Sequence, residues 1–517
     1  MSLEAFLSQL HADGNTSGLP GWEVDWDDAP LAYKLYRGLP TLPLSSDIPM
    51  TLEERTTPVE PSLKDIGHFL WYVYGLTQVS DSTAAPLRTY RRFVPSGGGL
   101  YPNELYVYLR KEAGVHGLYH YDAAHHRLVQ LREGDYDSYL ARALGSRCDL
   151  SSCFGVVFVS TMTWKNAFKY NTFAYRLQGL DSGVLLGQLQ EAAKRFGYAS
   201  SVHFRFLDRA VGHLLGLSGS EENVYAVIPL SVKRDIARID DAGGTPMQVA
   251  ADELCRELPA VQHDYYVRSR SVKKIPQLTQ MNEAAKLDTL SPFRRFEPVH
   301  RTESGLQTVY LPPVKRLNFD LAATSRARHS PESEFVLSRV TAEQLAALLQ
   351  EAAASFAYRN DLDGEREAPP HRVALYGCFY NVEGVPDGAY RYDAAAHALR
   401  RELAGDHRPR LQQGMTLHNV NLFQVPICLH IAGDDDHLIP QLGYRGYRIQ
   451  QMEAGMLLQR LLLAASALGL SGRPLLGFQA GACDELYRMS RHGRTTLVQI
   501  PIGCCLPRPR LEGGLHS

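Results

Sequence analysis

No stretch of the sequence is long and apolar enough to cross a membrane. The richest apolar segment, residues 456–470, is interrupted by Gln459 and Arg460, whereas a bilayer span needs roughly 18 to 20 apolar residues. The N-terminus also lacks the basic start and apolar core of a secretory signal. We therefore expect a cytoplasmic protein without a membrane partner.

The chain lacks an excess of positive charge and a metal-binding cysteine pattern. Lys plus Arg number 54 against 56 Asp plus Glu, which gives a net charge of −2 and no overall field that would favour nucleic acid. The 8 cysteines include no Cys-x-x-Cys pair, so a zinc-finger-type site is not indicated. We expect neither a nucleic-acid partner nor a bound metal.

An internal repeat organises the chain of 517 residues. Residues 175–190 (YRLQGLDSGVLLGQLQ) and 447–462 (YRIQQMEAGMLLQRLL) are identical at seven of sixteen positions, at a constant shift of 272. A shift of 271 places residues 117–124 on residues 388–395. Self-similarity of this kind indicates two related copies in one chain.

Each copy has the same order of predicted elements. Apolar residues at helical spacing end at Gly197 and again at Gly469, which indicates one long helix in each copy. We predict an α+β fold, a mixed sheet flanked by helices in each copy, with copies over residues 1–245 and 316–517 and a connector over 246–315. Apolar runs typical of buried strands occupy residues 106–109, 154–160 and 224–230 in the first copy and 373–376, 426–432 and 496–502 in the second.

Fusion of a two-fold homodimer into a single chain produces such a repeat. The chain is then a pseudo-dimer, in which sites at the former dimer interface lie between the copies. Only one of the two symmetry-related sites has to survive, so residues present in one copy alone mark the chemistry that is retained.

The first copy carries a glycine-rich loop that the second copy lacks. Residues 95–102 read Pro95-Ser96-Gly97-Gly98-Gly99-Leu100-Tyr101-Pro102, whereas the aligned stretch at 366–372 reads REAPPHR. Consecutive glycines let backbone amides approach a ligand closely, and the flanking prolines fix the entry and the exit of the loop. A flexible loop without a ligand is the alternative.

The first copy also contains Lys169-Tyr170, where the second has Gln441-Leu442. A lysine beside a tyrosine can act as a general acid/base pair, because a nearby cation lowers the pKa of the phenol and partial burial lowers that of the amine. A surface lysine next to a packing tyrosine is the alternative.

The second copy has distinctive residues of its own. Separated arginines near a helix start can bind a phosphate, although solvated charge is the alternative for each of them. A Pro-x-x-Gly-Phe loop after a buried helix can lie against a planar ring or form an ordinary turn. These residues are Arg326, Arg328, Pro474, Leu475, Leu476, Gly477, Phe478, Arg491 and Arg494.

Taken together, these motifs resemble the SagB-type, FMN-dependent azoline dehydrogenases of the nitroreductase superfamily. The resemblance spans the first copy from about residue 30 and, more loosely, the second from about residue 316. It is carried by the loop at 95–102 with Asn103-Glu104 after it, by residues 117–122, by Lys169-Tyr170 and by Tyr175-Arg176.

The resemblance implies FMN at the interface between nitroreductase-like copies. The first copy would supply Pro95, Ser96, Gly97, Gly98 and Gly99, and the second would supply Arg326, Arg328, Arg491 or Arg494 to the phosphate and Pro474 to Gly477 to the flavin ring. Because the reciprocal set is missing, we expect one FMN per chain. The basic motif Thr324-Ser325-Arg326-Ala327-Arg328 only approximates the family pattern, so the phosphate contacts are the less specific part.

By the same resemblance, Lys169 and Tyr170 are the catalytic pair, one being the base and the other tuning it. Tyr101 would line the substrate pocket or pack. The expected substrate is an azoline-containing peptide or carrier-bound intermediate, oxidised to a thiazole or oxazole with O2 as electron acceptor, and a cyclodehydratase is a possible partner. Two alternatives remain, an NAD(P)H-dependent nitro- or quinone reductase and a flavin-free scaffold of a biosynthetic complex.

Overall fold

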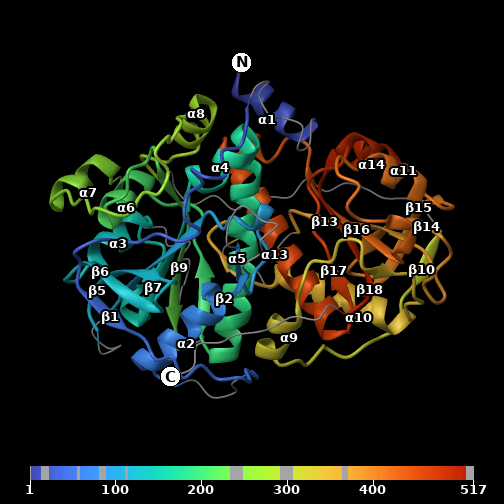
Figure 1. The fold of residues 1–517 in the computed structure, drawn as a ribbon, viewed down its shortest axis with the longest axis horizontal. Helices are drawn as coiled ribbons and strands as arrows, with labels where there is room; N and C mark the ends of the chain where they lie inside the picture. The colour runs from blue at the N-terminus through green and yellow to red at the C-terminus, as the bar shows by residue number, and fades with distance from the viewer. Residues whose placement is uncertain are drawn as a thin grey trace. The chain divides into compact units, whose positions relative to one another are not determined.

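The computed structural model describes residues 2–12, 22–54, 59–80, 89–110, 115–232, 249–290, 307–363 and 371–507. The chain divides into two units (Figure 1). The N-terminal unit contains residues 22–296 and 357–369, and the C-terminal unit contains residues 1–21, 297–356 and 370–511. The copy boundaries at residues 245 and 315 stay a prediction.

An eight-stranded sheet forms the centre of the N-terminal unit, in the order β1-β6-β5-β4-β7-β9-β8-β12. Neighbouring strands pair antiparallel, except that β12 runs parallel to β8, so this sheet is mixed. A separate hairpin pairs β2 (Leu76–Ser80) with β3 (Thr89–Arg92). The strands of the sheet are β1 (Thr41–Pro43), β4 (Asn103–Leu109), β5 (Gly117–Asp122), β6 (Arg127–Arg132), β7 (Gly155–Met162), β8 (Ala199–Val202), β9 (Glu222–Ser231) and β12 (Arg359–Asn360).

The longest helix of this unit, α5 (Ala174–Phe196), is buried along nearly its whole length. Helix α2 packs along α5, and α6 packs on α7 (Figure 1). Helix α5 ends at Gly197 with a φ of 73°, the left-handed conformation that glycine adopts readily. The other helices are α2 (Leu63–Tyr74), α3 (Asp137–Ala143), α4 (Trp164–Tyr170), α6 (Asp208–Leu215), α7 (Ala251–Glu257) and α8 (Pro276–Ala284).

The C-terminal unit repeats this plan. Its sheet has the order β10-β15-β14-β13-β16-β18-β11, with β17 also paired to β18. The strands are β10 (Thr308–Tyr310), β11 (Phe335–Val336), β13 (Ala374–Phe379), β14 (Gly388–Asp393), β15 (Ala398–Ala404), β16 (Ile427–Asp434), β17 (Ser471–Gly472) and β18 (Arg494–Cys505).

Helix α13 (Arg445–Ala467) corresponds to α5 and is also buried along nearly its whole length. Helix α10 packs along α13, as α2 packs along α5 (Figure 1). None of the helices in the described part of the chain is long and apolar enough to cross a bilayer. The remaining helices are α1 (Leu3–Ala12), α9 (Leu321–Ala327), α10 (Ala342–Ala353), α11 (Arg408–Gln413), α12 (Ile439–Leu442) and α14 (Ala480–Leu486).

These elements confirm the α+β fold and the repeat predicted from the sequence. The predicted strands coincide with β4, β7 and β9 in the first copy and with β13, β16 and β18 in the second, to within three residues at either end. The two long helices end at Gly197 and near Gly469, whose φ values are 73° and 74°. The repeated sequence therefore encodes a repeated structure.

Each unit also contains a segment that is distant from it in the sequence. Strand β12 follows α10 in the chain, yet it pairs with β8 of the N-terminal sheet. There Asp361 accepts hydrogen bonds of 2.8 Å from the backbone amides of Phe204 and Arg205. Helix α1 belongs to the C-terminal unit, where His11 Nε2 lies 2.5 Å from Thr495 Oγ1. The chain therefore crosses between the units more than once.

Both copies begin a helix with the same capping arrangement. Ser62 accepts a hydrogen bond from the Asp65 amide before α2, and Thr341 accepts one from the Gln344 amide before α10. In both cases the third residue of the helix accepts a bond from the cap amide in return, which defines a capping box.

We expect Ser62→Ala and Thr341→Ala each to lower the free energy of unfolding by about 1 kcal/mol, because each leaves a helix-terminal amide unsatisfied. Urea unfolding of the full chain, followed by circular dichroism, measures this. Ser62→Asp is the control, since aspartate also caps helices. Two alanine variants as stable as the parent would show that the caps contribute nothing.

Candidate functional site

The Pro-Ser-Gly loop, residues 95–102, connects β3 to β4. Gly97–Gly99 form one 3-10 turn, in which Gly98 has a φ of 66° and Gly99 a φ of 69°. These values lie in the left-handed region that side chains with a Cβ adopt rarely. The backbone of the loop thus requires Gly98 and Gly99, and the loop has a defined shape.

Asp181 of α5 accepts hydrogen bonds from this loop. Ser96 Oγ donates to Asp181 Oδ2 over 2.6 Å, and the Gly97 amide lies 3.2 and 3.3 Å from the two carboxylate oxygens. Ser96 Oγ in turn accepts a hydrogen bond of 2.9 Å from the Tyr101 amide. The two ends of the loop are therefore joined through one hydroxyl and one carboxylate.

The structure brings Lys169 and Tyr170 to the same loop. A Cβ placed on Gly98 would lie 2.5 Å from Tyr170 Oη and 3.2 Å from Lys169 Nζ. Both residues stand at the end of α4 and are half-buried. Two motifs about seventy positions apart in the sequence therefore meet at one place, and only glycine leaves room there for both side chains.

Aromatic rings surround the Lys169 ammonium. Its Nζ lies 5.2 Å from the ring centroid of Trp26 and 5.0 Å from that of Tyr170. The Trp26 ring meets Phe168 edge to face at 5.6 Å, and Trp22 donates a hydrogen bond of 3.1 Å to the Phe168 carbonyl. Burial among these rings lowers the pKa of Lys169 below its ordinary value, so a larger fraction of the amine is neutral and able to accept a proton.

A buried ion pair fixes the start of α4. Lys165 pairs with Glu104, and His120 Nε2 lies 2.9 Å from the other carboxylate oxygen of Glu104. Burial opposes the charge of Glu104, but Lys165 and His120 hold its pKa at about 2. The charged pair anchors α4 to β4 and so helps to place Lys169 and Tyr170 at the other end of the helix.

Two buried amides beside the Lys-Tyr pair lack part of their hydrogen bonding. Asn171 is 1% exposed, has a φ of 48°, and neither of its side-chain polar atoms has a partner among the described residues. Asn166 accepts a bond of 2.8 Å from Gln178, but its Nδ2 has no such partner. Buried polar atoms are seldom left unsatisfied in a folded protein. These amides are therefore available to hold a ligand next to Lys169 and Tyr170.

Tyr101, expected to line a pocket or to pack, is only 2% exposed. Its hydroxyl accepts a hydrogen bond of 3.2 Å from the Arg92 amide, and the Arg92 guanidinium lies 5.5 Å from its ring centroid. These contacts correspond to the packing alternative. A place for Tyr101 in a substrate pocket stays a prediction.

In the C-terminal unit, Arg326 lies in α9 and Arg328 directly follows that helix, both half-buried. Ser325, between Thr324 and Arg326, is 3% exposed, and its hydroxyl has no partner among the described residues. A hydroxyl and two guanidinium groups on one short segment suit an anion such as a phosphate.

The other two predicted phosphate ligands differ from each other. Arg491 is exposed. Arg494 donates a hydrogen bond of 2.7 Å to the Arg372 carbonyl and lies 3.4 Å from a carboxylate oxygen of Asp434. Arg494 therefore already has structural partners, which makes Arg491 the better candidate of the two.

The segment 474–477 runs beside β18. Leu475 exchanges backbone hydrogen bonds of 2.8 and 3.1 Å with Gln499, and the Gly477 carbonyl accepts a bond of 2.8 Å from the Thr416 amide. Leu475 is buried, while Pro474, Leu476 and Gly477 are half-buried. The backbone of this segment is therefore fixed, and its exposed side is available to a flat ligand.

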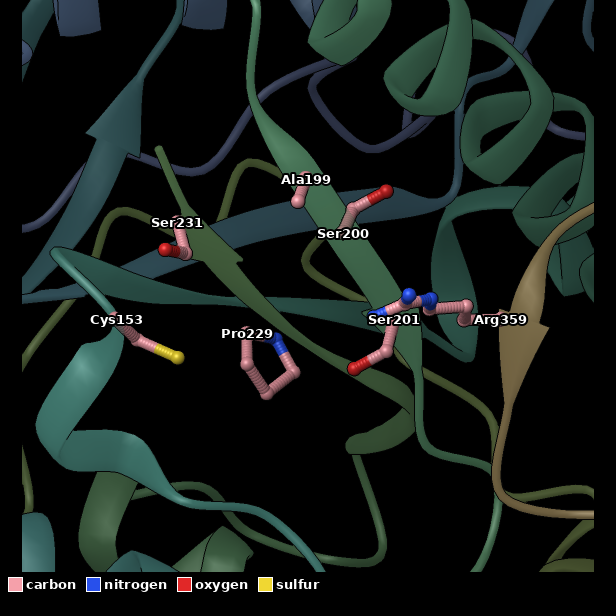
Figure 2. A pocket seen from close by; sticks show the side chains of 7 residues that line it. All are labelled: Cys153, Ala199, Ser200, Ser201, Pro229, Ser231 and Arg359. Atoms are coloured by element: carbon pink, nitrogen blue, oxygen red, sulfur yellow. The ribbon is translucent and has the colours of Figure 1, made fainter. Parts of the chain in front are cut away.

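A shallow hollow in the N-terminal unit lies away from the Pro-Ser-Gly loop and the Lys-Tyr pair (Figure 2). It contains none of the predicted site residues. Its lining combines three serine side chains with the exposed Arg359, and its residues are Cys153, Ala199, Ser200, Ser201, Pro229, Ser231 and Arg359.

Comparison with known proteins identifies the family. The model of the nitroreductase family matches residues 61–230 and 326–504, more than half of the chain. The chain belongs to the nitroreductase family. Each of its copies is a nitroreductase-like domain, and family membership implies an oxidoreductase; members of the nitroreductase family commonly bind FMN.

Two curated relatives and one solved structure are similar to this nitroreductase-family chain. The trifolitoxin-processing protein TfxB of Rhizobium leguminosarum bv. trifolii is 30% identical over 182 residues, 34% of this chain and 48% of TfxB. MJ1384 of Methanocaldococcus jannaschii, named as a nitroreductase, is 27% identical over 131 residues, 25% of this chain and 64% of that protein. The chain thus spans less than two thirds of either relative.

The crystal structure of a protein from Anabaena variabilis ATCC 29413, named as a nitroreductase, is similar to this chain. The alignment covers 98% of this chain and 99% of the Anabaena chain, with a TM-score of 0.72 and 23% sequence identity. At this identity the match shows the fold alone. The alignment extends through both copies of the present chain.

Three residues of the candidate site were not predicted from the sequence. Asp181, Trp26 and Asn171 adjoin the loop or the Lys-Tyr pair in the structure. A signal existed for Asp181, because the repeat places an acidic residue, Glu453, at the same position of the second copy. Asn171 directly follows the pair, whereas nothing in the sequence links Trp26 to Lys169.

Replacing Trp26 tests the cause of the low pKa of Lys169. Trp26→Ala exposes the amine to water, so its pKa is expected to rise toward the ordinary lysine value of about 10.4. The pH dependence of Lys169 acylation, followed by mass spectrometry, measures the pKa directly. Trp22→Ala is the control, because Trp22 bonds the Phe168 carbonyl instead of covering the amine. An unchanged pKa in Trp26→Ala would mean that other groups desolvate Lys169.

Proposed function

We propose that this nitroreductase-family protein is an FMN-dependent dehydrogenase that oxidises thiazoline or oxazoline rings in a peptide natural-product precursor to thiazoles or oxazoles. The observation that carries the proposal is the meeting of Lys169 and Tyr170 with Gly98 of the Pro-Ser-Gly loop. Aromatisation of an azoline removes one proton and one hydride from the ring. It therefore requires a base close to the flavin, and Lys169 and Tyr170 lie at the loop that we propose receives the flavin.

The residues present fit FMN. A Cβ on Gly99 would meet no atom within 4 Å, so the loop has open space on that side, and Asn171 offers unpartnered buried amide atoms nearby. In the C-terminal unit, Ser325 offers a buried hydroxyl beside Arg326. We assign the loop residues Ser96 to Gly99 to the flavin ring. In the C-terminal unit, taken by itself, residues 474–477 suit a flat ring, and Arg326, Arg328 and Arg491 suit a phosphate.

When bound, FMN supplies the two-electron acceptor, which O2 reoxidises. The chain supplies the base: Lys169 or Tyr170 removes the proton from the ring carbon next to the carbonyl. Burial among aromatic rings favours the neutral amine of Lys169, which is the form that accepts a proton. Trp26 covers the amine and Phe168 packs against Trp26, while the Lys165–Glu104 pair holds α4 in place.

Similarity to TfxB, a protein named for processing trifolitoxin, supports a peptide as the substrate. A peptide-modifying enzyme needs a partner that forms the azoline ring first, so a cyclodehydratase is the expected supplier of the substrate. The alternative substrate is a carrier-bound intermediate that contains the same azoline ring.

An NAD(P)H-dependent nitro- or quinone reductase is the second candidate, favoured by the family match and by the name of MJ1384. The two functions differ in the electron donor that reduces the flavin and in the acceptor that reoxidises it. Rapid reduction of the bound flavin by NADPH supports the reductase, whereas reduction by an azoline peptide supports the dehydrogenase.

The first test is the flavin content of the purified chain, from the visible spectrum and from released FMN. We expect one FMN per chain, because the loop and the Lys-Tyr pair occur in the first copy alone. Two FMN per chain would contradict the single site, and a colourless protein that no added FMN restores would indicate a scaffold. Lys169→Ala should keep its flavin and lose turnover of an azoline peptide by at least about a hundredfold, the range of general-base catalysis.

Gly98→Ala and Gly99→Ala form a matched pair that tests the loop. Both put a Cβ at a positive φ, but only the Cβ at position 98 meets Tyr170 Oη and Lys169 Nζ. We therefore expect Gly98→Ala to retain much less FMN than Gly99→Ala, measured as the absorbance ratio of flavin to protein. Equal retention would mean that the contact at Gly98 does not shape the flavin site.

A further inference from the structure

We propose that the Asp181 carboxylate is a positioning residue that holds the Pro-Ser-Gly loop in the shape that receives the flavin, and that protonation of Asp181 loosens the loop. This inference rests on the proposed FMN site.

The contacts at Asp181 come from the part of the loop assigned to the flavin. Ser96 Oγ and the Gly97 amide both donate to its oxygens, at 2.6 Å and at 3.2 and 3.3 Å. Because Ser96 Oγ also accepts from the Tyr101 amide at 2.9 Å, the carboxylate orients a hydroxyl that closes the loop. Hydrogen bonds to an ionised carboxylate are stronger than those to a neutral group, so the charge of Asp181 stiffens the loop.

The same position in the second copy has a different partner. Glu453, at the shift of 272 from Asp181, accepts hydrogen bonds from Arg372 Nε and Nη2 on its two carboxylate oxygens, and both side chains are buried. Asp181 is 6% exposed and has no cationic partner among the described residues. A buried carboxylate without a counter-charge is costly. Its presence in the first copy, which alone has the loop, points to a function there.

The protonation of Asp181 changes near neutral pH. Burial raises its pKa to about 7, against the opposing effect of the bonds from Ser96 and Gly97. Below this value the carboxyl is neutral and its bonds to the loop weaken, and above it the charged form holds the loop. Affinity for FMN should therefore increase as the pH rises through about 7.

The other titratable and charged groups around the loop have to be separated from Asp181. Tyr74 of α2 stays protonated, because burial raises its pKa well above the ordinary value, and Glu104 of β4 stays charged, with a pKa of about 2. Lys169 has a lowered pKa and lies at Gly98, so it is removed in a second background. The remaining groups near the loop are Arg92 of β3, Tyr101 of the loop, Lys165 and Tyr170 of α4, and Arg176 of α5.

Titration of the flavin-free full chain with FMN between pH 6 and 8, followed by flavin fluorescence, tests the proposal. We expect the Kd of the parent to fall roughly tenfold between pH 6 and pH 8, the effect of about one charge-assisted hydrogen bond. Asp181→Asn should bind FMN about tenfold more weakly than the parent at pH 8, with a smaller dependence on pH than the parent, the remainder coming from the second ionisation of the FMN phosphate at about pH 6. Lys169→Met should keep the pH dependence of the parent.

Asp137→Asn is the matched control, because burial also raises the pKa of Asp137. Its carboxylate bonds Tyr108 and Arg110 instead of the loop, so the pH dependence of FMN binding should persist in this variant. Parental affinity and pH dependence in Asp181→Asn would overturn the proposal.

Two further results keep the test decisive. If Asp181→Asn does not fold, the parent and Ser96→Ala are compared instead. A parental Kd for FMN that is constant from pH 6 to 8 overturns the proposal. Weaker FMN binding by Ser96→Ala, with its pH dependence shifted from that of the parent, supports it. A parent that binds no FMN at any pH would instead overturn the proposed function itself.

Discussion

Both units depend on burying a helix of 23 residues on almost every side, α5 in one and α13 in the other. A helix in this position has to satisfy every polar side chain from its own surroundings, because water does not reach it. Asp181 does so through the Gly97 amide and the Ser96 hydroxyl of a loop, and Glu453 does so through an arginine. In each unit, an acidic side chain of the buried helix therefore binds a segment that packs against the helix: the Pro-Ser-Gly loop in one unit and Arg372 in the other.

This coupling explains how two copies of one fold came to differ. The helix and sheet are retained in both, since they form the core. Where the helix meets the loop and α4, the first copy has Lys169 and Tyr170, which can move a proton, and the second copy has Gln441 and Leu442. The second copy has its arginines and the segment 474–477 instead, which suit a bound anion and a flat ring.

Sequence patterns predicted the fold well, because buried strands appear as apolar runs and long helices as apolar residues at helical spacing. The internal repeat shows each of these patterns twice. They also singled out the loop and the Lys-Tyr pair, although not that the two lie together at Gly98, and the roles of these residues stay a prediction. Trp26 and Asp181 were missed for a physical reason. Their roles arise from contacts across many residues, and a tryptophan or an acidic residue by itself is compatible with many surroundings. The parallel pairing of β12 with β8 was unpredictable for the same reason, since a strand of two residues has no periodicity.

Strand β12 has a consequence for how the chain can be divided. It lies after α10 in the sequence but completes the edge of the N-terminal sheet, and α1 at the start of the chain belongs with the C-terminal unit. A single cut between the copies would therefore take an element away from each unit and uncover β8, and an unpaired sheet edge favours aggregation. Each half of the chain therefore needs an element that the other half encodes to complete its unit.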